Sequence, residues 1–226
     1  MELFWLALCA DDVPAHDAWL SAGERDVLGR LRFDKRRQDW RLGRYAAKQA
    51  LSQAWSATCG GSAPARLEIL AAADGAPELR GHTAPCPSFS LSHSAGRALC
   101  VVAGPGTRVG CDIEFIETRA AAFVEDFFAP EEQARFSAVP ARDYALSVTL
   151  AWSAKESALK LLRTGLRVDT RTVVARWPAA CPQDGWNPLE VSVPGEPNPL
   201  NGWWQTLGNF VVTAVSTPAA PAPTPL

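Results

Sequence analysis

Hydrophobic periodicity along the chain predicts a succession of helices and strands. Apolar residues two apart, or short β-branched runs, indicate strands, and apolar residues at i, i+3, i+4 and i+7 indicate helices. These patterns predict strands at residues 1–10, 67–71, 88–94, 97–103, 109–114, 172–177, 189–193 and 210–216, and helices at 19–31, 41–51, 120–128, from 130, and at 143–163. Each half of the chain is predicted to contain helices and about three strands, so we expect an α+β fold.

A tight turn at Gly104–Thr107 is the best candidate for a boundary between two halves, 1–105 and 106–216. The last ten residues, 217–226, contain four prolines and are predicted to be disordered. The apolar start of the chain lacks a basic segment and carries Glu2, so we interpret it as a buried strand rather than a signal peptide. No convincing internal repeat is visible in the residues themselves.

Acidic residues on one predicted strand and one predicted helix are candidates for a shared polar site. Residues two apart on a strand share a face, so Asp112 and Glu114 should point the same way. On the helix, Glu156 and Lys160 are one turn apart and also share a face. Three carboxylates offer the oxygen ligands that suit Mg2+, and a nearby lysine suits a phosphate. Spacing alone leaves the alternative open that these are ordinary surface pairs.

The composition is typical of a globular protein and excludes a general polyanion binder. Of the 226 residues, 47% are hydrophobic and 20% are charged, and the formal net charge is -2. The six cysteines contain no C-x-x-C pair, which favours free thiols over a disulfide framework or a zinc site. No apolar run approaches the length of a membrane span. We expect a cytoplasmic protein with neither nucleic acid nor membrane as a partner.

The most basic segment runs from Arg30 to Lys48, with eight basic residues against two acidic ones. Within it, Arg41, Arg44 and Lys48 form a basic stripe on a helix whose other face is apolar. The stripe is either a solvated surface or a cradle for a phosphate or an acidic partner. Nucleic acid is a weaker explanation, because the segment is short and carries few aromatic residues.

The strand predicted at 88–94 ends in a polar tip, Ser92-His93-Ser94. A lone histidine is more often structural than functional. Its place between two serines at a strand end favours a functional role somewhat, since such a tip offers N–H and hydroxyl donors to an anion.

Three blocks of residues, in this order, resemble the surfactin-type 4'-phosphopantetheinyl transferases. They are Phe89–Ser94, Val109–Glu114 and Trp152–Lys160, and weaker similarity is present at Phe127–Glu132 and Arg41–Arg44. Each block is moderately specific, and all three in order are highly specific.

The resemblance implies a Mg2+-dependent holo-acyl-carrier-protein synthase. Such an enzyme transfers the 4'-phosphopantetheine arm of coenzyme A to a serine of an apo acyl, peptidyl or aryl carrier protein and releases adenosine 3',5'-bisphosphate. It serves fatty-acid, polyketide or nonribosomal-peptide biosynthesis. The resemblance also implies a monomer with two similar α+β halves, related by a pseudo-two-fold axis, and an active site at their interface.

The resemblance also assigns roles to single residues. Asp112, Glu114 and Glu156 would bind Mg2+, and Lys160 would contact the phosphates and stabilise the charge that develops during transfer. The general base for the carrier serine would be Glu156 or Glu132, directly or through water.

Coenzyme A binding is assigned to further residues in the same way. Ser92 and His93 would bind a phosphate of coenzyme A, and Lys155 the nucleotide or the carrier. The other assigned positions are Arg41, Arg44 and Gly75.

One departure concerns the nucleotide end of the site. Gly75-Ala76-Pro77 stands where the family has a lysine or arginine between Gly and Pro. The missing cation weakens coenzyme A binding unless another arginine, such as Arg80, replaces it.

Two functions other than transfer are compatible with parts of the same residue pattern. One is a Mg2+-dependent hydrolase that uses the same carboxylates on a nucleotide pyrophosphate. The other is a non-catalytic module that binds carrier proteins or coenzyme A through the basic helix. The three carboxylates and Lys160 argue against the second alternative, since a pure binding module does not need them.

Overall fold

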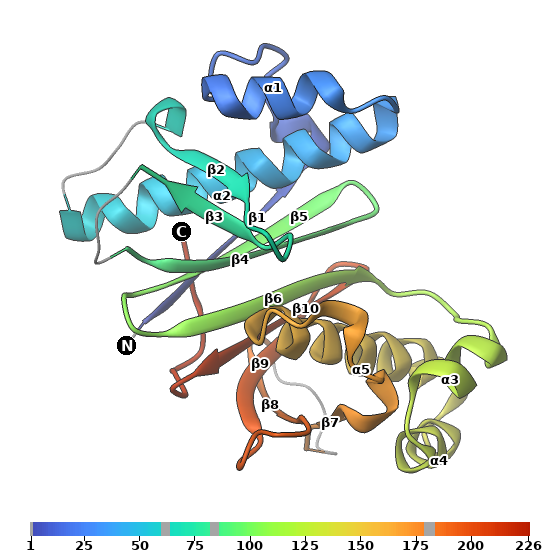
Figure 1. The fold of residues 1–226 in the computed structure, drawn as a ribbon. Coiled ribbons are helices and arrows are strands. Elements are labelled where there is room, and N and C mark those ends of the chain that lie inside the picture. Colours follow the sequence, from blue (N-terminus) through green and yellow to red (C-terminus); the bar gives the residue numbers. More distant parts are fainter. Residues whose placement is uncertain (1, 60–63, 82–85, 179–183) are drawn as a thin grey trace.

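The computed structural model describes residues 2–59, 64–81, 86–178 and 184–226 (Figure 1). The described residues form a mixed α+β fold, as the sequence predicted. The helices are α1 Ala22–Arg30, α2 Asp34–Cys59, α3 Ala121–Phe127, α4 Pro130–Ala138 and α5 Ala141–Leu161. The strands are β1 Leu3–Cys9, β2 Glu68–Ala71, β3 Pro77–Arg80, β4 Ser88–Ser94, β5 Arg97–Ala103, β6 Arg108–Phe115, β7 Val174–Arg176, β8 Asn187–Ser192, β9 Leu200–Leu207, β10 Phe210–Thr217 and β11 Thr224–Pro225.

The strands form two larger sheets and one hairpin. One sheet has the order β11-β1-β5-β4, the other has the order β6-β10-β9-β8-β7, and β2 pairs with β3. The two sheets have similar strand pairings. In the first sheet β5 pairs with β1 and with β4, and in the second sheet β10 pairs with β6 and with β9. The pseudo-two-fold relation between the halves stays a prediction. We propose the boundary between 1–105 and 106–216 at the turn that joins β5 to β6.

One long helix packs on each sheet (Figure 1). The apolar stripe of α2, which includes Ala47, Ala50 and Leu51, packs against Cys100 and Val102 of β5. Helix α5 packs in the same way against the second sheet, with a stripe of small and apolar residues turned toward β10. The helical periodicity in the sequence predicted both buried faces, because residues three and four apart lie on one side of a helix.

Side chains join the two sheets along a seam between the edge strands β4 and β6. Serines at every second position of β4 point toward β6, as strand geometry requires. Ser90 Oγ accepts a hydrogen bond from the backbone N–H of Cys111 at 2.9 Å. Further along the seam, Ser92 Oγ donates to an Asp112 oxygen at 2.6 Å and Ser94 Oγ donates to a Glu114 oxygen at 3.2 Å. The seam therefore places two of the predicted metal ligands between the two halves of the chain.

Three strands, β3, β9 and β11, were absent from the sequence-based prediction. Strand β3 begins at Pro77, and proline weakens the sequence signal because it is confined to edges and first positions of strands. Strand β9 contains Gly202, which weakens the sequence signal for a strand. Here the glycine allows close packing, because a Cβ atom at Gly202 would lie 2.6 Å from the carbonyl oxygen of Ala214.

The C-terminal segment 217–226 differs from the expected disordered tail. Strand β11 pairs in parallel with β1, and Leu226 N–H donates to the carbonyl of Trp5 at 3.0 Å. The Trp203 ring N–H donates to the carbonyl of Ala220 at 2.9 Å. Prolines donate no backbone hydrogen bond, but an edge position leaves their missing donors without consequence.

The cysteines Cys9, Cys86, Cys100 and Cys111 form no disulfide. The side chains of Cys59 and Cys181 lie outside the described residues. In the described part of the chain, no helix has both the length and the apolar character needed to cross a bilayer.

Candidate active site

A glycine allows strand β6 to lie directly against helix α5. A Cβ atom at Gly110 would overlap the carbonyl oxygen of Ser157 and lie 2.6 Å from the backbone nitrogen of Leu161. Only a residue without a side chain permits this approach. The close packing brings the next polar residue of β6, Asp112, within reach of Lys160 near the end of α5.

Asp112 is the centre of the candidate site, and its side chain is almost completely buried. Its Oδ1 atom accepts hydrogen bonds from Lys160 Nζ at 2.7 Å and from Ser92 Oγ at 2.6 Å. Lys160 Nζ also donates to Ser92 Oγ at 2.9 Å. The other oxygen, Oδ2, is buried without a hydrogen-bond partner. A buried carboxylate oxygen normally has a partner, so this atom indicates a position where a bound group completes the site.

Two further carboxylates lie near Asp112. Glu114, on the same face of β6, accepts a hydrogen bond from Arg119 at 3.3 Å in addition to the one from Ser94. Burial raises the pKa of Glu114, and the negative charge of Asp112 raises it further. Burial also raises the pKa of Glu156, where Lys160 acts in the opposite direction and Asp112 adds to the increase. These carboxylates therefore repel one another, and a bound cation would relieve the repulsion.

Lys160 remains positively charged in this environment. Burial alone would lower the pKa of its ammonium group, but Asp112, with smaller contributions from Cys111 and Glu156, reverses the effect and raises the pKa. The ammonium group is thus a fixed positive charge beside the carboxylates. As the side chains stand, no group of three or more His, Cys, Asp or Glu residues within the described segments is close enough together to hold a metal ion. The donor chemistry of the three carboxylates and the unpartnered Oδ2 atom nevertheless suit Mg2+.

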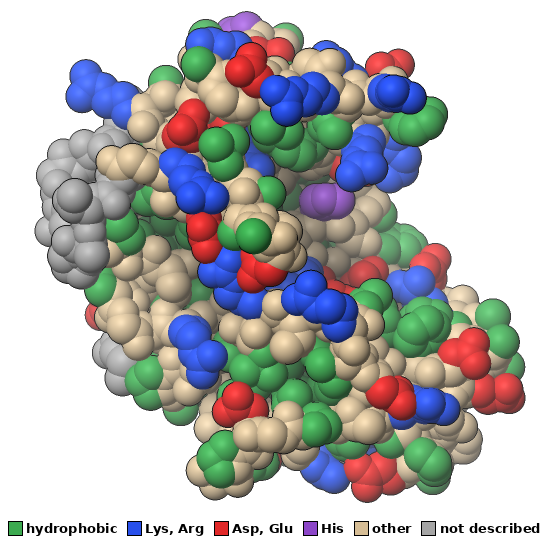
Figure 2. All heavy atoms as spheres, viewed as in Figure 1, with side chains coloured by type: hydrophobic (Ala, Val, Ile, Leu, Met, Phe, Trp, Pro, Cys, Tyr) green, Lys and Arg blue, Asp and Glu red, His purple; other side chains and the backbone are tan. Residues whose placement is uncertain are grey.

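His93 lies at the exposed end of β4, beside Gly43 of α2. Partial loss of hydration lowers the pKa of its imidazole, and Lys160 contributes in the same direction, while Asp39 opposes the change. The ring is therefore mostly neutral at pH 7. In Figure 2, charged side chains of both signs line the hollow between the upper and lower parts of this face.

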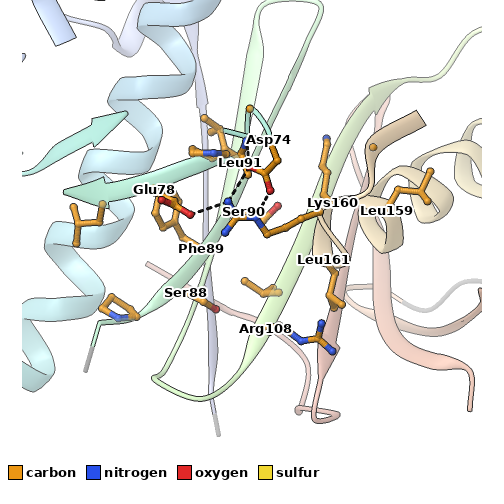
Figure 3. A pocket seen from close by; sticks show the side chains of 18 of the residues that line it. Asp74, Glu78, Ser88, Phe89, Ser90, Leu91, Arg108, Leu159, Lys160 and Leu161 are labelled. Carbon is orange, nitrogen blue, oxygen red and sulfur yellow. Dashed lines mark hydrogen bonds and ion pairs between the residues drawn. The ribbon is translucent and has the colours of Figure 1, made fainter. Parts of the chain in front are cut away.

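A cavity of about 590 Å3 adjoins Lys160 between the β2–β3 hairpin and the seam (Figure 3). Its walls include Gly75 and Ala76 of the hairpin turn, Arg108 of β6 and Arg163, which follows α5. The volume is in the range of small-molecule sites. Gly75 therefore lines the cavity, which is the position that a role in ligand binding would require.

Glu132 and Lys155 are committed to each other and lie away from the Asp112 cluster. Both are fully buried, and Lys155 Nζ donates to Glu132 Oε2 at 2.6 Å. Lys155 also donates to the carbonyls of Phe127 and Thr170, at 3.1 and 2.8 Å. Glu132 also accepts hydrogen bonds from backbone N–H groups at the start of α4 and on β7. All three N–H donors of Lys155 are used inside the protein, and Glu132 is buried with both oxygens engaged, so their roles toward a ligand stay a prediction.

The basic stripe of α2 is likewise used inside the protein. Lys48 is fully buried, forms an ion pair with Glu24 and donates to the carbonyl of Trp19 at 2.8 Å. Arg44 is buried with its Nε atom 3.9 Å from Glu24. The third member, Arg41, donates to two backbone carbonyls and pairs with Asp17 at 2.9 Å. The stripe is therefore neither a solvated surface nor an open cradle.

Some residues of the site were not found from the sequence. Ser90 and Ser94 belong to the seam, and their signal was present as serines at every second position from 88 to 94. Arg108 and Arg163 line the cavity, but no motif marks them. Arg80, the expected substitute for a cation at position 76, instead lies 3.7 Å from Glu78 on its own strand.

Comparison with known proteins bears on the same region. Residues 108–201 match the model of the 4'-phosphopantetheinyl transferase superfamily. Among solved structures, a holo-(acyl-carrier-protein) synthase from Bacillus anthracis str. Ames, in complex with CoA (3',5'-ADP), is 22% identical, with a TM-score of 0.39, and the match covers 46% of this chain and 95% of that one. A holo-acyl-carrier-protein synthase from Thermotoga maritima is 23% identical, with a TM-score of 0.37, over 56% of this chain and 74% of that one. A search of curated proteins found no match.

The matched segment begins with β6 and includes α5, so it contains both elements that meet at Gly110. It therefore carries the four candidate residues of the second half of the chain, which are Asp112, Glu114, Glu156 and Lys160. The match to the 4'-phosphopantetheinyl transferase superfamily model, which spans less than half of the chain, therefore falls on the segment that carries these residues.

Proposed function

We propose that the protein transfers the 4'-phosphopantetheine arm of coenzyme A to a serine of an apo carrier protein and releases adenosine 3',5'-bisphosphate. The observation that carries this proposal is Asp112, with one oxygen held by Ser92 and Lys160 and the other buried without a partner. Glu114 and Glu156 beside it supply further negative charge. The family match of the same segment supports the reaction type.

The metal in this proposal is Mg2+. Asp112, Glu114 and Glu156 would hold it, because hard divalent cations prefer carboxylate oxygens. When bound, Mg2+ would neutralise charge on the pyrophosphate of coenzyme A. The Ser92 hydroxyl holds Oδ1 of Asp112 and leaves Oδ2 without a partner.

Lys160 has the role of a fixed cation for the leaving group. Its raised pKa keeps the ammonium group protonated, and Asp112 and Ser92 hold it in place. A positive charge that is already oriented stabilises the negative charge that grows on the leaving phosphate.

We assign the general base to Glu156. The carrier serine must lose its proton as its oxygen attacks phosphorus, and a carboxylate with a raised pKa accepts a proton more readily. Glu132, the other candidate, is buried and engaged by Lys155 on one oxygen and by a β7 amide on the other. His93 is assigned to a coenzyme A phosphate, whereas Arg41, Arg44 and Lys155 are assigned to structure.

The test is incubation of the protein with coenzyme A, Mg2+ and several apo carrier proteins, followed by mass spectrometry of each carrier. We expect the mass of one phosphopantetheine to be added to at least one carrier, and we expect a metal chelator to prevent the addition. No addition to any carrier would contradict the proposal. A control without carrier detects direct hydrolysis of coenzyme A, and binding that survives chelation without any reaction would indicate a non-catalytic module.

A further inference from the structure

Arg163 has an unusual backbone conformation directly after helix α5. Its φ angle is 58°, in the left-handed region that glycine adopts freely and that costs an L side chain free energy. A helix often ends with such a residue, but the position is usually glycine. Here the N–H groups of Arg163 and Thr164 donate to the carbonyls of Lys160 and Leu159, both at 3.1 Å, so the hydrogen bonds that end the helix hold Arg163 in this conformation.

The side chain of Arg163 spans the cavity beside Lys160. Its Nε and Nη2 atoms donate to the two carboxylate oxygens of Asp74 at 2.7 and 2.9 Å. Nη2 also lies 2.7 Å from Glu78 Oε1. Asp74 and Glu78 belong to the β2–β3 hairpin, so these contacts connect the hairpin to the end of α5. Figure 3 shows both carboxylates turned toward the cavity.

The ion pairs of Arg163 are partly exposed, and its backbone conformation does not depend on them. The side chains of Arg163, Asp74 and Glu78 are 44%, 29% and 36% exposed. Ion pairs at this exposure contribute little to stability, because water and salt screen them. The hydrogen bonds from Arg163 lower the pKa of Asp74 to about 2, so both partners stay charged at neutral pH. A change of pH near neutrality therefore does not release Arg163.

The cavity contains the groups that a phosphate requires. Lys160 and Arg108 line it together with Arg163. Arg108 is exposed, and no carboxylate lies within ion-pairing distance of it in the described part of the chain. A phosphate carries more charge than one carboxylate and accepts two parallel hydrogen bonds from a guanidinium group. It can thus replace Asp74 and Glu78 as the partner of Arg163.

We propose that Arg163 binds a phosphate group of the co-substrate, and that Asp74 and Glu78 hold its guanidinium group over the cavity until that phosphate replaces them. The inference rests on the proposed function, which supplies a ligand with several phosphates. It gives the cavity a cation for its nucleotide end, where the hairpin turn carries Ala76. Arg163 is then a determinant of affinity for the phosphorylated co-substrate.

The first experiment measures binding of adenosine 3',5'-bisphosphate by isothermal titration calorimetry to the wild type, Arg163→Gly and Arg163→Lys. Glycine suits the φ angle of this position, so Arg163→Gly should fold normally. We expect its affinity to fall about tenfold or more, the usual effect of losing hydrogen bonds to a charged group. Arg163→Lys keeps the charge but loses the paired hydrogen bonds and should show an intermediate affinity.

The second experiment separates ligand binding from a purely structural connection. The pair Asp74→Asn and Glu78→Gln keeps the size of both side chains and releases Arg163. We expect this double variant to bind adenosine 3',5'-bisphosphate more tightly than the wild type, and the gain to vanish when Arg163→Gly is added. This cycle isolates the contribution that depends on Arg163.

Three results would overturn the inference. Weaker binding in both the double variant and Arg163→Gly would show that the contacts only hold the hairpin. An equal gain with and without Arg163 would show a general effect of negative charge, and unchanged binding in Arg163→Gly would exclude Arg163 altogether. If the wild type neither binds the nucleotide nor modifies a carrier, the proposed function fails and this inference fails with it. Transfer by the wild type with unchanged binding in Arg163→Gly would refute the inference alone.

Discussion

Replacing Lys155 with methionine tests whether the Glu132–Lys155 pair is structural. The change keeps the length and apolar volume of the side chain and removes its charge. In the folded protein Lys155 is fully buried and donates to Glu132, Phe127 and Thr170 at 2.6, 3.1 and 2.8 Å. Those contacts connect α5 to the start of α4 and to the turn before β7.

The magnitude follows from the charge that remains. Without Lys155, Glu132 is a buried carboxylate whose remaining donors are the backbone N–H groups of Ala129 and Ala175, at 3.0 and 3.2 Å. Removing one partner of a buried ion pair costs about 3–5 kcal/mol of unfolding free energy. For a chain of this size, about 2–4 °C of melting temperature is lost per kcal/mol. We therefore expect a decrease of roughly 6–20 °C.

The first half of the chain offers a matched control. Lys48 of α2 is also fully buried and pairs with Glu24, which accepts hydrogen bonds from the N–H groups of Ser21 and Ile69 at 2.8 and 3.0 Å. Lys48→Met should cost somewhat less than Lys155→Met, because Arg44 lies 3.9 Å from Glu24 and compensates part of its charge. Lys155 lies on α5, the helix that carries Glu156 and Lys160, whereas Lys48 lies on α2. At temperatures where both variants are folded, the kcat of transfer should therefore be closer to wild type in Lys48→Met than in Lys155→Met.

The assay is urea unfolding at pH 7, followed by circular dichroism, with transfer activity measured on the same preparations. Adding Glu132→Gln to Lys155→Met should restore part of the stability, because no uncompensated charge remains. A loss below about 1 kcal/mol in Lys155→Met would refute the reasoning, since that is the range of an exposed pair. Lys155 and Glu132 would then return to the candidates for ligand binding and proton transfer.

Three further predictions concern the candidate site. Asp112→Asn should lower the kcat/KM of carrier modification by at least about 100-fold with the circular dichroism spectrum unchanged, and near wild-type activity would remove Asp112 from the metal site. Gly110→Ala should cost about 1–3 kcal/mol in urea unfolding because its Cβ overlaps Ser157, whereas Gly104→Ala, with no atom within 4 Å of the added Cβ, should change stability by less than about 0.5 kcal/mol. Equal effects would contradict the packing argument. The pKa of His93 is lowered in the free protein, so a phosphate that favours the protonated ring binds together with uptake of a proton by His93. The affinity for adenosine 3',5'-bisphosphate should therefore strengthen from about pH 8 to about pH 6 more in the wild type than in His93→Gln. Because the lowered pKa makes the folded state bind fewer protons than the unfolded one, the contribution of His93 to the free energy of unfolding should be constant above about pH 6.5 and decline as the pH falls, in the wild type but not in His93→Gln.

The sequence by itself determined the central arrangement of polar residues. Asp112 and Glu114 share a face because side chains alternate on a strand, and Glu156 and Lys160 share a face because a helix turns once in 3.6 residues. Gly110, which precedes Cys111-Asp112, lies against α5 at a distance that no side chain would allow. These are local rules, so residues near one another in the chain suffice to apply them.

Tertiary structure alone decided which charged residues are available to a ligand. Periodicity places Lys48 and Lys155 on helix faces but cannot say what covers those faces. Segments far away in the sequence bring Glu24 to Lys48 and Glu132 to Lys155, and a buried lysine takes such a partner because an unpaired charge is costly away from water. The same arrangement of glutamate and lysine occurs in both halves, although no repeat is visible in the residues.

Pairing between distant segments also decided the ends of the site. The alternating serines of β4 mark one face of that strand, but nothing in the sequence indicates that this face meets β6, that β11 pairs with β1, or that Arg163 reaches Asp74. Such contacts join residues that local propensity treats as independent. The shared faces of Asp112 with Glu114 and of Glu156 with Lys160 were therefore predictable from strand and helix geometry, whereas the cavity beside Lys160 depends on how the β2–β3 hairpin packs against the end of α5.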